Sequence, residues 1–180
     1  MEQHSAINKP RCSVFIAASV DGYIADSEGS TDFLTVVEAP GEDYGYADFE
    51  STVDGLVVGR RTYEAALRLP SWPYRTRVIV LAGETVLVPR HGEEFYSGDV
   101  SELTAQLGRE GLRHLYVDGG ATVRSFLDAG LVDELTISIV PVVLGSGVPL
   151  FGAGVRRRQL DLIRSRSFES GLVQLTYVPR

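Results

Sequence analysis

Two short stretches of this chain combine residue types that suit the binding of a phosphorylated ligand. Residues 118–122 read Asp-Gly-Gly-Ala-Thr, follow the apolar run 115–117 and open an amphipathic segment. Paired glycines let backbone N–H groups approach an anion, and a helix start adds partial positive charge. A tight turn from strand to helix needs the same glycines, so this stretch by itself leaves both interpretations open.

The second stretch, Gly-Arg-Arg-Thr at 59–62, directly follows the apolar run 56–58. Guanidinium forks and a hydroxyl suit a phosphate monoester. Arg60 and Arg61 could equally be solvated charges at the start of a helix. Arginine at that position opposes the helix dipole, which favours a bound anion.

A third stretch, 19–25, is a loop after the first apolar run and contains Asp21 and Gly22. Residues 29–35, Gly-Ser-Thr-Asp-Phe-Leu-Thr, follow it. Because open α/β folds bind ligands at the carboxyl ends of their strands, both segments are candidate parts of a site. The simpler interpretation of Asp21 and Gly22 is a turn.

The elements that must position these residues alternate between strand-like and helix-like patterns. This alternation is typical of an α/β domain with a mainly parallel sheet and helices on both faces. Helices are predicted after residues 41–43, after the N-cap Ser101, and from Ala121 to Gly130. Because Pro141 and a long irregular stretch precede the last strand, we expect an antiparallel C-terminal edge. The predicted strands are 14–18, 56–58, 78–81, 115–117, 135–140 and 172–178.

Composition and charge exclude several classes of protein. The chain has 180 residues, 44% of them hydrophobic, and we predict a single domain over 1–180. A net charge of −7 argues against nucleic acid as a partner, because its binders carry a basic face. The single Cys12 cannot form an internal disulfide, so a reducing, cytoplasmic setting fits best. His4, His91 and His114 lack partners at ligand spacing, so we expect no metal site.

No stretch suits membrane insertion. The apolar run 13–20 follows Lys9 and Arg11 as in a signal peptide, but it is short and runs directly into a turn. The longer run 137–151 is interrupted by prolines and glycines before it reaches the roughly 20 residues that a bilayer needs.

In chain order, the motifs SVDGYIA, STDFL, VVGRRTYE, LYVDGGATV and LVDELTISIVPVVLGSGVPLF closely resemble the RibD C-terminal family. This family is the reductase half of the riboflavin-pathway deaminase-reductase and shares the dihydrofolate reductase fold. The resemblance covers about 12–178. It implies a twisted, mainly parallel sheet with NADPH across the strand ends and a substrate pocket beside the nicotinamide. The deaminase half is absent, because its zinc site needs two cysteines.

The resemblance also implies roles for individual residues. Residues 59–62 would hold the adenosine 2′-phosphate and pyrophosphate, 119–122 would cradle the pyrophosphate, and the loop 20–25 would close over the nicotinamide. In dihydrofolate reductases a cis peptide bond joins the paired glycines, which Gly119 and Gly120 would share. The implied cofactor-binding residues are Ala18, Gly22, Tyr23, Ile24, Gly59, Arg60, Arg61, Thr62, Leu81, Gly119, Gly120, Ala121 and Thr122. The implied substrate-binding residues are Asp21, Phe33, Thr35 and Tyr46.

Asp43 and Asp32 are the candidate catalytic residues. Dihydrofolate reductases bind the pterin with a carboxylate on the helix before the GR-x-T segment, and by spacing its nearest equivalent is Asp43. On a helix, Asp43 would share a face with Tyr46. It could also be an acidic residue that the helix dipole favours in a first turn. The Trp-x-x-Pro stretch of dihydrofolate reductases is missing, which disfavours folate reduction.

The expected activity is NADPH-dependent transfer of a hydride to a small pterin- or pyrimidine-like heterocycle. A phosphorylated ribosylamino-pyrimidine would need a second phosphate site, for which Arg75, Arg77 and the arginines 156–158 are the candidates. The alternative is a nucleotide-binding or interaction module that has lost turnover. The resemblance also implies a homodimer, through the apolar region 137–144 near a sheet edge.

Overall fold

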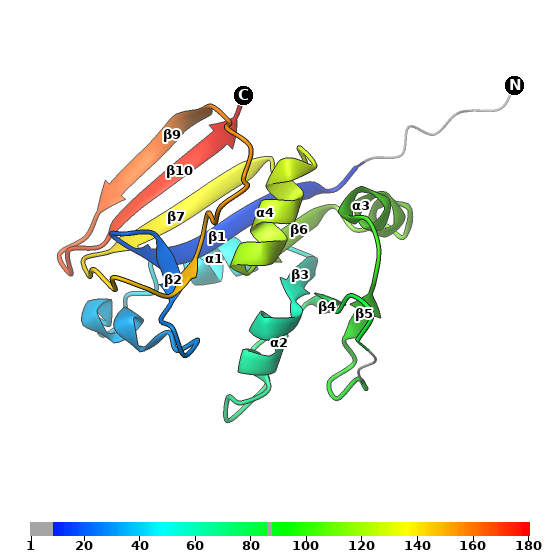
Figure 1. Cartoon of the computed structure of the whole chain (residues 1–180), viewed down its shortest axis with the longest axis horizontal. Coiled ribbons are helices and arrows are strands. Elements are labelled where there is room, and N and C mark those ends of the chain that lie inside the picture. The colour runs from blue at the N-terminus through cyan, green and yellow to red at the C-terminus, as the bar shows by residue number, and fades with distance from the viewer. Residues whose placement is uncertain (1–8, 86–87) are drawn as a thin grey trace, which may run out of the picture.

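The computed structural model describes residues 9–85 and 88–180. Its centre is an eight-stranded sheet in the order β5-β4-β3-β6-β1-β7-β10-β9, and a small sheet pairs β2 with β8 (Figure 1). The strands are β1 (Arg11–Ser19), β2 (Tyr23–Ala25), β3 (Gly55–Gly59), β4 (Arg77–Leu81), β5 (Glu94–Tyr96), β6 (His114–Asp118), β7 (Glu134–Val140), β8 (Val148–Pro149), β9 (Leu160–Ser167) and β10 (Val173–Pro179). The helices are the 3-10 helix η1 (Asp32–Val37), α1 (Tyr46–Glu50), α2 (Arg60–Ala66), α3 (Val100–Arg109) and α4 (Gly120–Asp128).

The large sheet is mostly parallel. Neighbouring strands from β5 across to β7 all run in one direction. β10 is antiparallel to β7, and β9 is antiparallel to β10. The predicted fold class, a mainly parallel sheet with an antiparallel C-terminal edge, is therefore confirmed. The outermost strand of that edge is β9, which the sequence patterns did not reveal.

The apolar region 137–144 does not lie at a sheet edge. Its strand, β7, pairs with β1 on one side and with β10 on the other. Leu135, Ile137 and Val140 are buried. The expected place of this region near a sheet edge is wrong, because the chain returns after it and adds two more strands. The homodimer itself stays a prediction.

Both faces of the sheet are covered, as the continuous apolar strands predict. Val14 and Ile16 of β1 share a core with residues of α3 and α4, whereas Phe15 packs with α1 on the opposite face. Figure 1 shows α4 in front of the sheet and α1 behind it. No helix in the described ranges is long and apolar enough to cross a membrane.

Two helices start elsewhere than the sequence patterns predict. The N-cap of α3 is Asp99, whose Oδ1 accepts hydrogen bonds from the backbone N–H of Ser101 at 2.7 Å and of Glu102 at 3.1 Å. Ser101 is therefore inside the helix and is not the N-cap that was predicted. The carboxylate of Asp99 lies two residues earlier and accepts from two of the free N–H groups at the helix start. α4 starts at Gly120, one residue before the predicted start.

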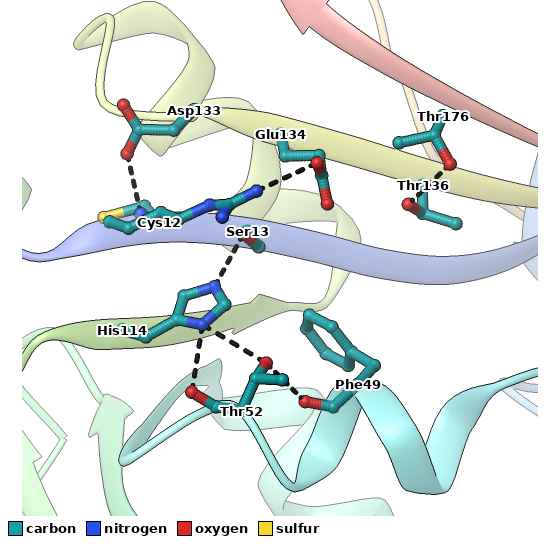
Figure 2. Close-up of polar contacts among 10 residues, drawn as sticks. Cys12, Ser13, Phe49, Thr52, His114, Asp133, Glu134, Thr136 and Thr176 are labelled. Atoms are coloured by element: carbon teal, nitrogen blue, oxygen red, sulfur yellow. Dashed lines mark hydrogen bonds and ion pairs between the residues drawn. The ribbon is translucent and has the colours of Figure 1, made fainter. Parts of the chain in front are cut away.

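A polar network joins three elements at the amino ends of the strands (Figure 2). The His114 ring of β6 lies 2.8 Å from Ser13 Oγ in β1, and its Nδ1 lies 3.1 Å from the Thr52 carbonyl after α1. A carbonyl can only accept, so Nδ1 carries the hydrogen and Nε2 accepts from Ser13. Burial lowers the pKa of His114, which favours this neutral ring. The network stabilises the end of the sheet that is remote from the glycine stretches.

Candidate functional site

The two glycine stretches lie side by side. β3 and β6 are parallel neighbours in which Val58 pairs with Asp118, so Gly59 and Gly119 follow at the same edge of the sheet. α2 starts directly after Gly59, and α4 starts directly after Gly119. Two helix starts therefore converge at the carboxyl ends of adjacent strands, where open α/β sheets bind their ligands.

Each of these glycines faces a threonine hydroxyl from the other stretch. A Cβ added to Gly119 would lie 2.5 Å from Thr62 Oγ1, and one added to Gly59 would lie 3.0 Å from Thr122 Oγ1. Gly119 also has a φ of +92°, a conformation that favours glycine. The peptide bond from Gly119 to Gly120 is trans, because the described residues contain no cis bond. The expected cis bond is thus not found.

The small sheet packs against the start of α4. A Cβ added to Gly120 would lie 2.9 Å from the Pro149 carbonyl oxygen in β8 and 3.2 Å from Ile24 Cδ1 in β2. Arg124 of α4 donates from Nη1 to the carbonyls of Pro149 at 2.9 Å and Leu150 at 3.2 Å. The chain around β2, which belongs to the loop expected to close over the nicotinamide, is therefore held against the second glycine stretch.

A groove of about 710 Å³ runs along these strand ends, and we call it the strand-end groove. It brings together residues from all three stretches that the sequence singled out. Ala18, Gly22 and Tyr23 are outside its lining, and Ala17 lines it where Ala18 was expected. The predicted cofactor residues that line the groove are Ile24, Gly59, Arg60, Arg61, Thr62, Leu81, Gly119, Gly120, Ala121 and Thr122.

Positive charge gathers in the strand-end groove. Arg60, Arg61, Arg68 and Arg124 all line it and outnumber its three carboxyl groups, Glu28, Glu64 and Asp118, although the chain as a whole has a net charge of −7. Arg60 forms an exposed ion pair with Glu64 at 3.7 Å, a contact that contributes little stability and that an incoming anion can replace. The groove therefore suits a ligand with several phosphate groups.

Asp118 is the acid at the strand end between the two glycine stretches, and its residue type and spacing did not mark it as a proton donor. It ends β6, and its Oδ1 accepts a hydrogen bond from the Gly119 N–H at 2.8 Å. Burial raises its pKa to about 6. The pKa of Tyr46 is raised to about 12, mainly by burial, then by the charge of Glu50 and then by that of Asp118. Perturbed acids of this kind gather at functional sites.

A second cavity, of about 750 Å³, lies beside the groove, and we call it the side cavity. Both share Phe15, Ala17 and Leu34, so they meet at these residues. The Phe15 and Tyr46 rings lie edge to face with centroids 5.9 Å apart and form an aromatic wall. The other residues that line the side cavity are Val37, Glu38, Ala39, Pro40, Glu42, Asp43, Tyr44, Ser138 and Leu172.

The predicted substrate residues divide between these places. Tyr46 lines the side cavity. Phe33 is buried in the core under η1, and its neighbour Leu34 lines both cavities. Thr35 is exposed, and its hydroxyl donates to the carbonyl of Asp32 at 2.7 Å. The carboxylate of Asp32, on the exposed start of η1, is outside the lining of both cavities.

Asp21 acts as a clamp between two loops. Its carboxylate accepts hydrogen bonds from Ser19 Oγ at 2.6 Å, from the Leu144 N–H at 3.1 Å and from the Gly145 N–H at 2.7 Å. These bonds, that of Ser19 most of all, lower its pKa to about 2. Asp21 lines neither cavity, so its contacts tie the turn after β1 to the loop after β7.

Asp43 lines the side cavity but lies before the helix that was expected to carry it. α1 begins only at Tyr46, because Gly45 in a left-handed conformation precedes it. The Asp43 carboxylate accepts from the N–H groups of Gly45 and Ala47, each at 2.9 Å. The bond from Ala47, followed by that from Gly45, lowers the pKa of Asp43. Asp43 is therefore an anion that caps a turn.

His91, for which no metal-binding role is expected, packs against an aromatic ring. The His91 ring stacks on Trp72, with centroids 4.6 Å apart. Glu93, two residues later, is buried and accepts from Tyr63 Oη at 2.6 Å. Across the described ranges, no three His, Cys, Asp or Glu side chains gather as metal ligands would.

Comparison with known proteins identifies relatives over most of the chain. The model of the RibD C-terminal domain matches residues 72–174. The uncharacterized protein YwjB of Bacillus subtilis is 38% identical over 168 residues, which are 92% of this chain and 95% of YwjB.

Solved structures agree with the fold. A Shewanella sp. PV-4 protein whose name refers to riboflavin biosynthesis has a TM-score of 0.89 at 38% identity, over 94% of this chain and 99% of that one. Dihydrofolate reductase from Enterococcus faecalis, at 15% identity, has a TM-score of 0.65 over 96% of this chain and 98% of its own. The dihydrofolate reductase-like fold that the motifs imply is confirmed.

Proposed function

Because this chain belongs to the RibD C-terminal domain family, we propose that it is an NADPH-dependent reductase that transfers a hydride to a small pterin- or pyrimidine-like heterocycle. One observation carries the proposal: the strand-end groove and the side cavity share Phe15, Ala17 and Leu34. A long ligand in the groove can therefore present one end to a second ligand in the side cavity. Hydride transfer requires such direct contact.

The strand-end groove fits NADPH. A Cβ at Gly119 would collide with Thr62, and one at Gly120 with Pro149, so bare backbone faces the groove and can approach a pyrophosphate. Arg60 and Arg61 supply guanidinium groups for the 2′-phosphate. The Enterococcus faecalis dihydrofolate reductase, which has the same fold, was solved with NADP(H).

NADPH supplies the hydride when bound, and the residues of this chain supply position, exclusion of water and a proton. Phe15, Ala17 and Leu34 give the junction of the cavities an apolar surface. Asp118 holds a proton on its carboxyl up to a pH of about 6, which suits a general acid. Asp43 and Asp32 stay the acids predicted from the sequence. The lowered pKa of Asp43 suits it to accept N–H groups from a heterocycle.

The test separates binding from turnover. Thermal unfolding with NADPH measures binding, since a ligand at about 100 times its Kd stabilises the native state by roughly 2.7 kcal/mol. Loss of NADPH absorbance over many turnovers, against a panel of pterins and aminopyrimidines, measures reduction. Binding with oxidation supports the reductase. Binding without oxidation of any compound supports the alternative, a nucleotide-binding module that has lost turnover. No binding contradicts the reductase and favours an interaction module.

A further inference from the structure

The basic residues are distributed unevenly between the two cavities. All 17 lysines and arginines of the chain lie in the described ranges. Arg60, Arg61, Arg68 and Arg124 line the strand-end groove, whereas no lysine or arginine is among the described residues that line the side cavity. Phosphate recognition relies on such groups. The side cavity therefore has no basic side chain to neutralise a phosphate.

The arginines that could have formed a second phosphate site are engaged or placed elsewhere. Arg77 is on β4, where it pairs with Glu94 and with Glu110, each at 2.6 Å. β6 and β3 separate that strand from β1, which lines the side cavity. Arg156 lies 3.8 Å from Asp128 at the end of α4. Arg75, Arg157 and Arg158 line neither cavity.

The side cavity carries negative charge instead. Glu38, Glu42 and Asp43 line it, and none of them forms an ion pair with a basic residue in the described part of the chain. A phosphate dianion placed among three carboxylates is repelled, because like charges that face each other disfavour binding. An N–H donor or a positively charged ring is attracted to the same carboxylates.

The remaining lining suits a flat ring. Phe15, Tyr46 and Tyr44 supply aromatic surface. Ser138 is buried and lines the cavity, and its Oγ accepts from Gln174 Nε2 at 3.1 Å. A hydroxyl that accepts in this way keeps its own hydrogen to donate. The cavity thus offers stacking surface, carboxylate acceptors and a hydroxyl.

On the premise of the reductase function, we propose that the side cavity takes a substrate without phosphate. The substrate class is a flat, amino-substituted heterocycle, neutral or cationic, whose ring lies against Phe15 and Tyr46 and whose N–H groups point to the carboxylates of Glu38, Glu42 and Asp43. A phosphorylated ribosylamino-pyrimidine is rejected by the same charges. This chain is thereby distinguished from a reductase of phosphorylated intermediates.

Arg166 contacts the aromatic side chains beside the side cavity. Its guanidinium lies 4.9 Å from the Phe168 ring centroid, and the Phe168 ring meets Tyr44 edge to face at 4.9 Å. Arg166 does not line the cavity. It is a basic side chain that a phosphorylated substrate could recruit, so it provides the control variant.

The test is equilibrium binding by calorimetry to the NADPH-saturated protein and to the protein alone. The probes are diaminopteridine and an aminouracil riboside with and without a ribose phosphate. We expect diaminopteridine to bind, and the riboside to bind at least about tenfold more tightly than its phosphate. The Glu38 carboxylate makes no hydrogen bond or ion pair with the residues at 9–85 and 88–180. Glu38→Gln removes its charge and narrows the ratio between the two affinities, and Glu38→Arg reverses it.

Three results overturn the proposal: tighter binding of the phosphorylated riboside, loss of that binding in Arg166→Ala, or no binding of diaminopteridine and riboside. NADPH affinity is measured in the same titrations. Loss of the reductase function shows as absent NADPH binding or absent oxidation, whereas the ratio between the two ribosides can be read on the protein alone. The two failures are therefore distinguishable.

Discussion

Thr62 Oγ1 occupies the space next to the α-carbon of Gly119, so that a Cβ on this glycine would lie only 2.5 Å from it. Thr62 is in α2 and Gly119 precedes α4, so this contact joins the two glycine stretches across β3 and β6. Its reciprocal is the approach of Thr122 Oγ1 to Gly59. The groove floor, which is the backbone of Gly59 and Gly119, is thus packed closely against two threonine hydroxyls.

Gly119→Ala should abolish NADPH binding and lower the melting temperature. A residue with a Cβ is strained at the φ of +92° and ψ of 136° of Gly119, at a cost of about 1–3 kcal/mol, and the added Cβ also collides with Thr62. Gly111→Ala is the matched control, since Gly111 has a φ of +101° and no atom within 4 Å of an added Cβ. Thermal unfolding with and without NADPH measures both effects.

The collision itself can be isolated with a double-mutant cycle. Thr62→Ala removes the hydroxyl, and the remaining Thr62 Cβ lies 3.6 Å from the added Cβ, an ordinary contact. Gly119→Ala together with Thr62→Ala should therefore be more stable than the sum of the single changes predicts. If the effects of the two substitutions on stability are additive, the Thr62 hydroxyl and the added Cβ do not collide.

Arg60→Ala should weaken NADPH binding by about tenfold or more and leave NADH binding nearly unchanged. A hydrogen bond to a charged group contributes about 1.5–3 kcal/mol, and NADH lacks the 2′-phosphate. The folded state should lose little stability, because the ion pair of Arg60 with Glu64 is exposed. Fluorescence titration with both cofactors measures the ratio, with Arg75→Ala as the control. Equal weakening of both cofactors would remove Arg60 from the 2′-phosphate site.

Glu93→Gln should destabilise the protein by about 2–3 kcal/mol at neutral pH. Burial opposes the charge of Glu93, but hydrogen bonds from Tyr63, Arg90 N–H and His91 N–H outweigh it and lower its pKa to about 2. Because the folded pKa is below the usual 4.5, this stabilisation is present above pH 4.5 and is lost as pH falls toward 2. The mutant should thus differ least from wild type in acid. Glu169→Gln, at an exposed position, is the control in urea unfolding; an equal effect there would contradict the argument.

The sequence could predict the glycine stretches because their chemistry is local. A strand end, glycines and a helix start are adjacent in the chain at 59–62 and again at 118–122. The adjacency of β3 and β6 depends on the sheet order, which periodicity does not contain. It was available only through the family resemblance.

Some residues lie elsewhere in the site than predicted, and each difference also depends on structure that a local pattern does not contain. Leu34 rather than Phe33 lines both cavities, because the 3-10 helix η1 sets which side chain turns toward the core. Asp43 lies outside α1, because Gly45 in a left-handed conformation delays the helix. Asp118 acquires its raised pKa from burial by segments that are distant in the chain, which no local pattern records.

Asp118→Asn should make both stability and activity less dependent on pH. The folded pKa of about 6 is above the ordinary 3.8, so the stability contribution of this carboxyl is fully present below pH 3.8 and is lost as pH rises through about 6. The asparagine stays neutral and keeps an oxygen for the Gly119 N–H. At pH 8 the mutant should therefore melt about 5 °C above wild type, and this gain should vanish near pH 4.

If Asp118 donates the proton, wild-type kcat falls as pH rises through about 6, whereas the kcat of Asp118→Asn is low and does not change with pH. Asp48→Asn, on the exposed side of α1, is the control, and a wild-type kcat with no inflection near pH 6 would exclude Asp118 as the acid.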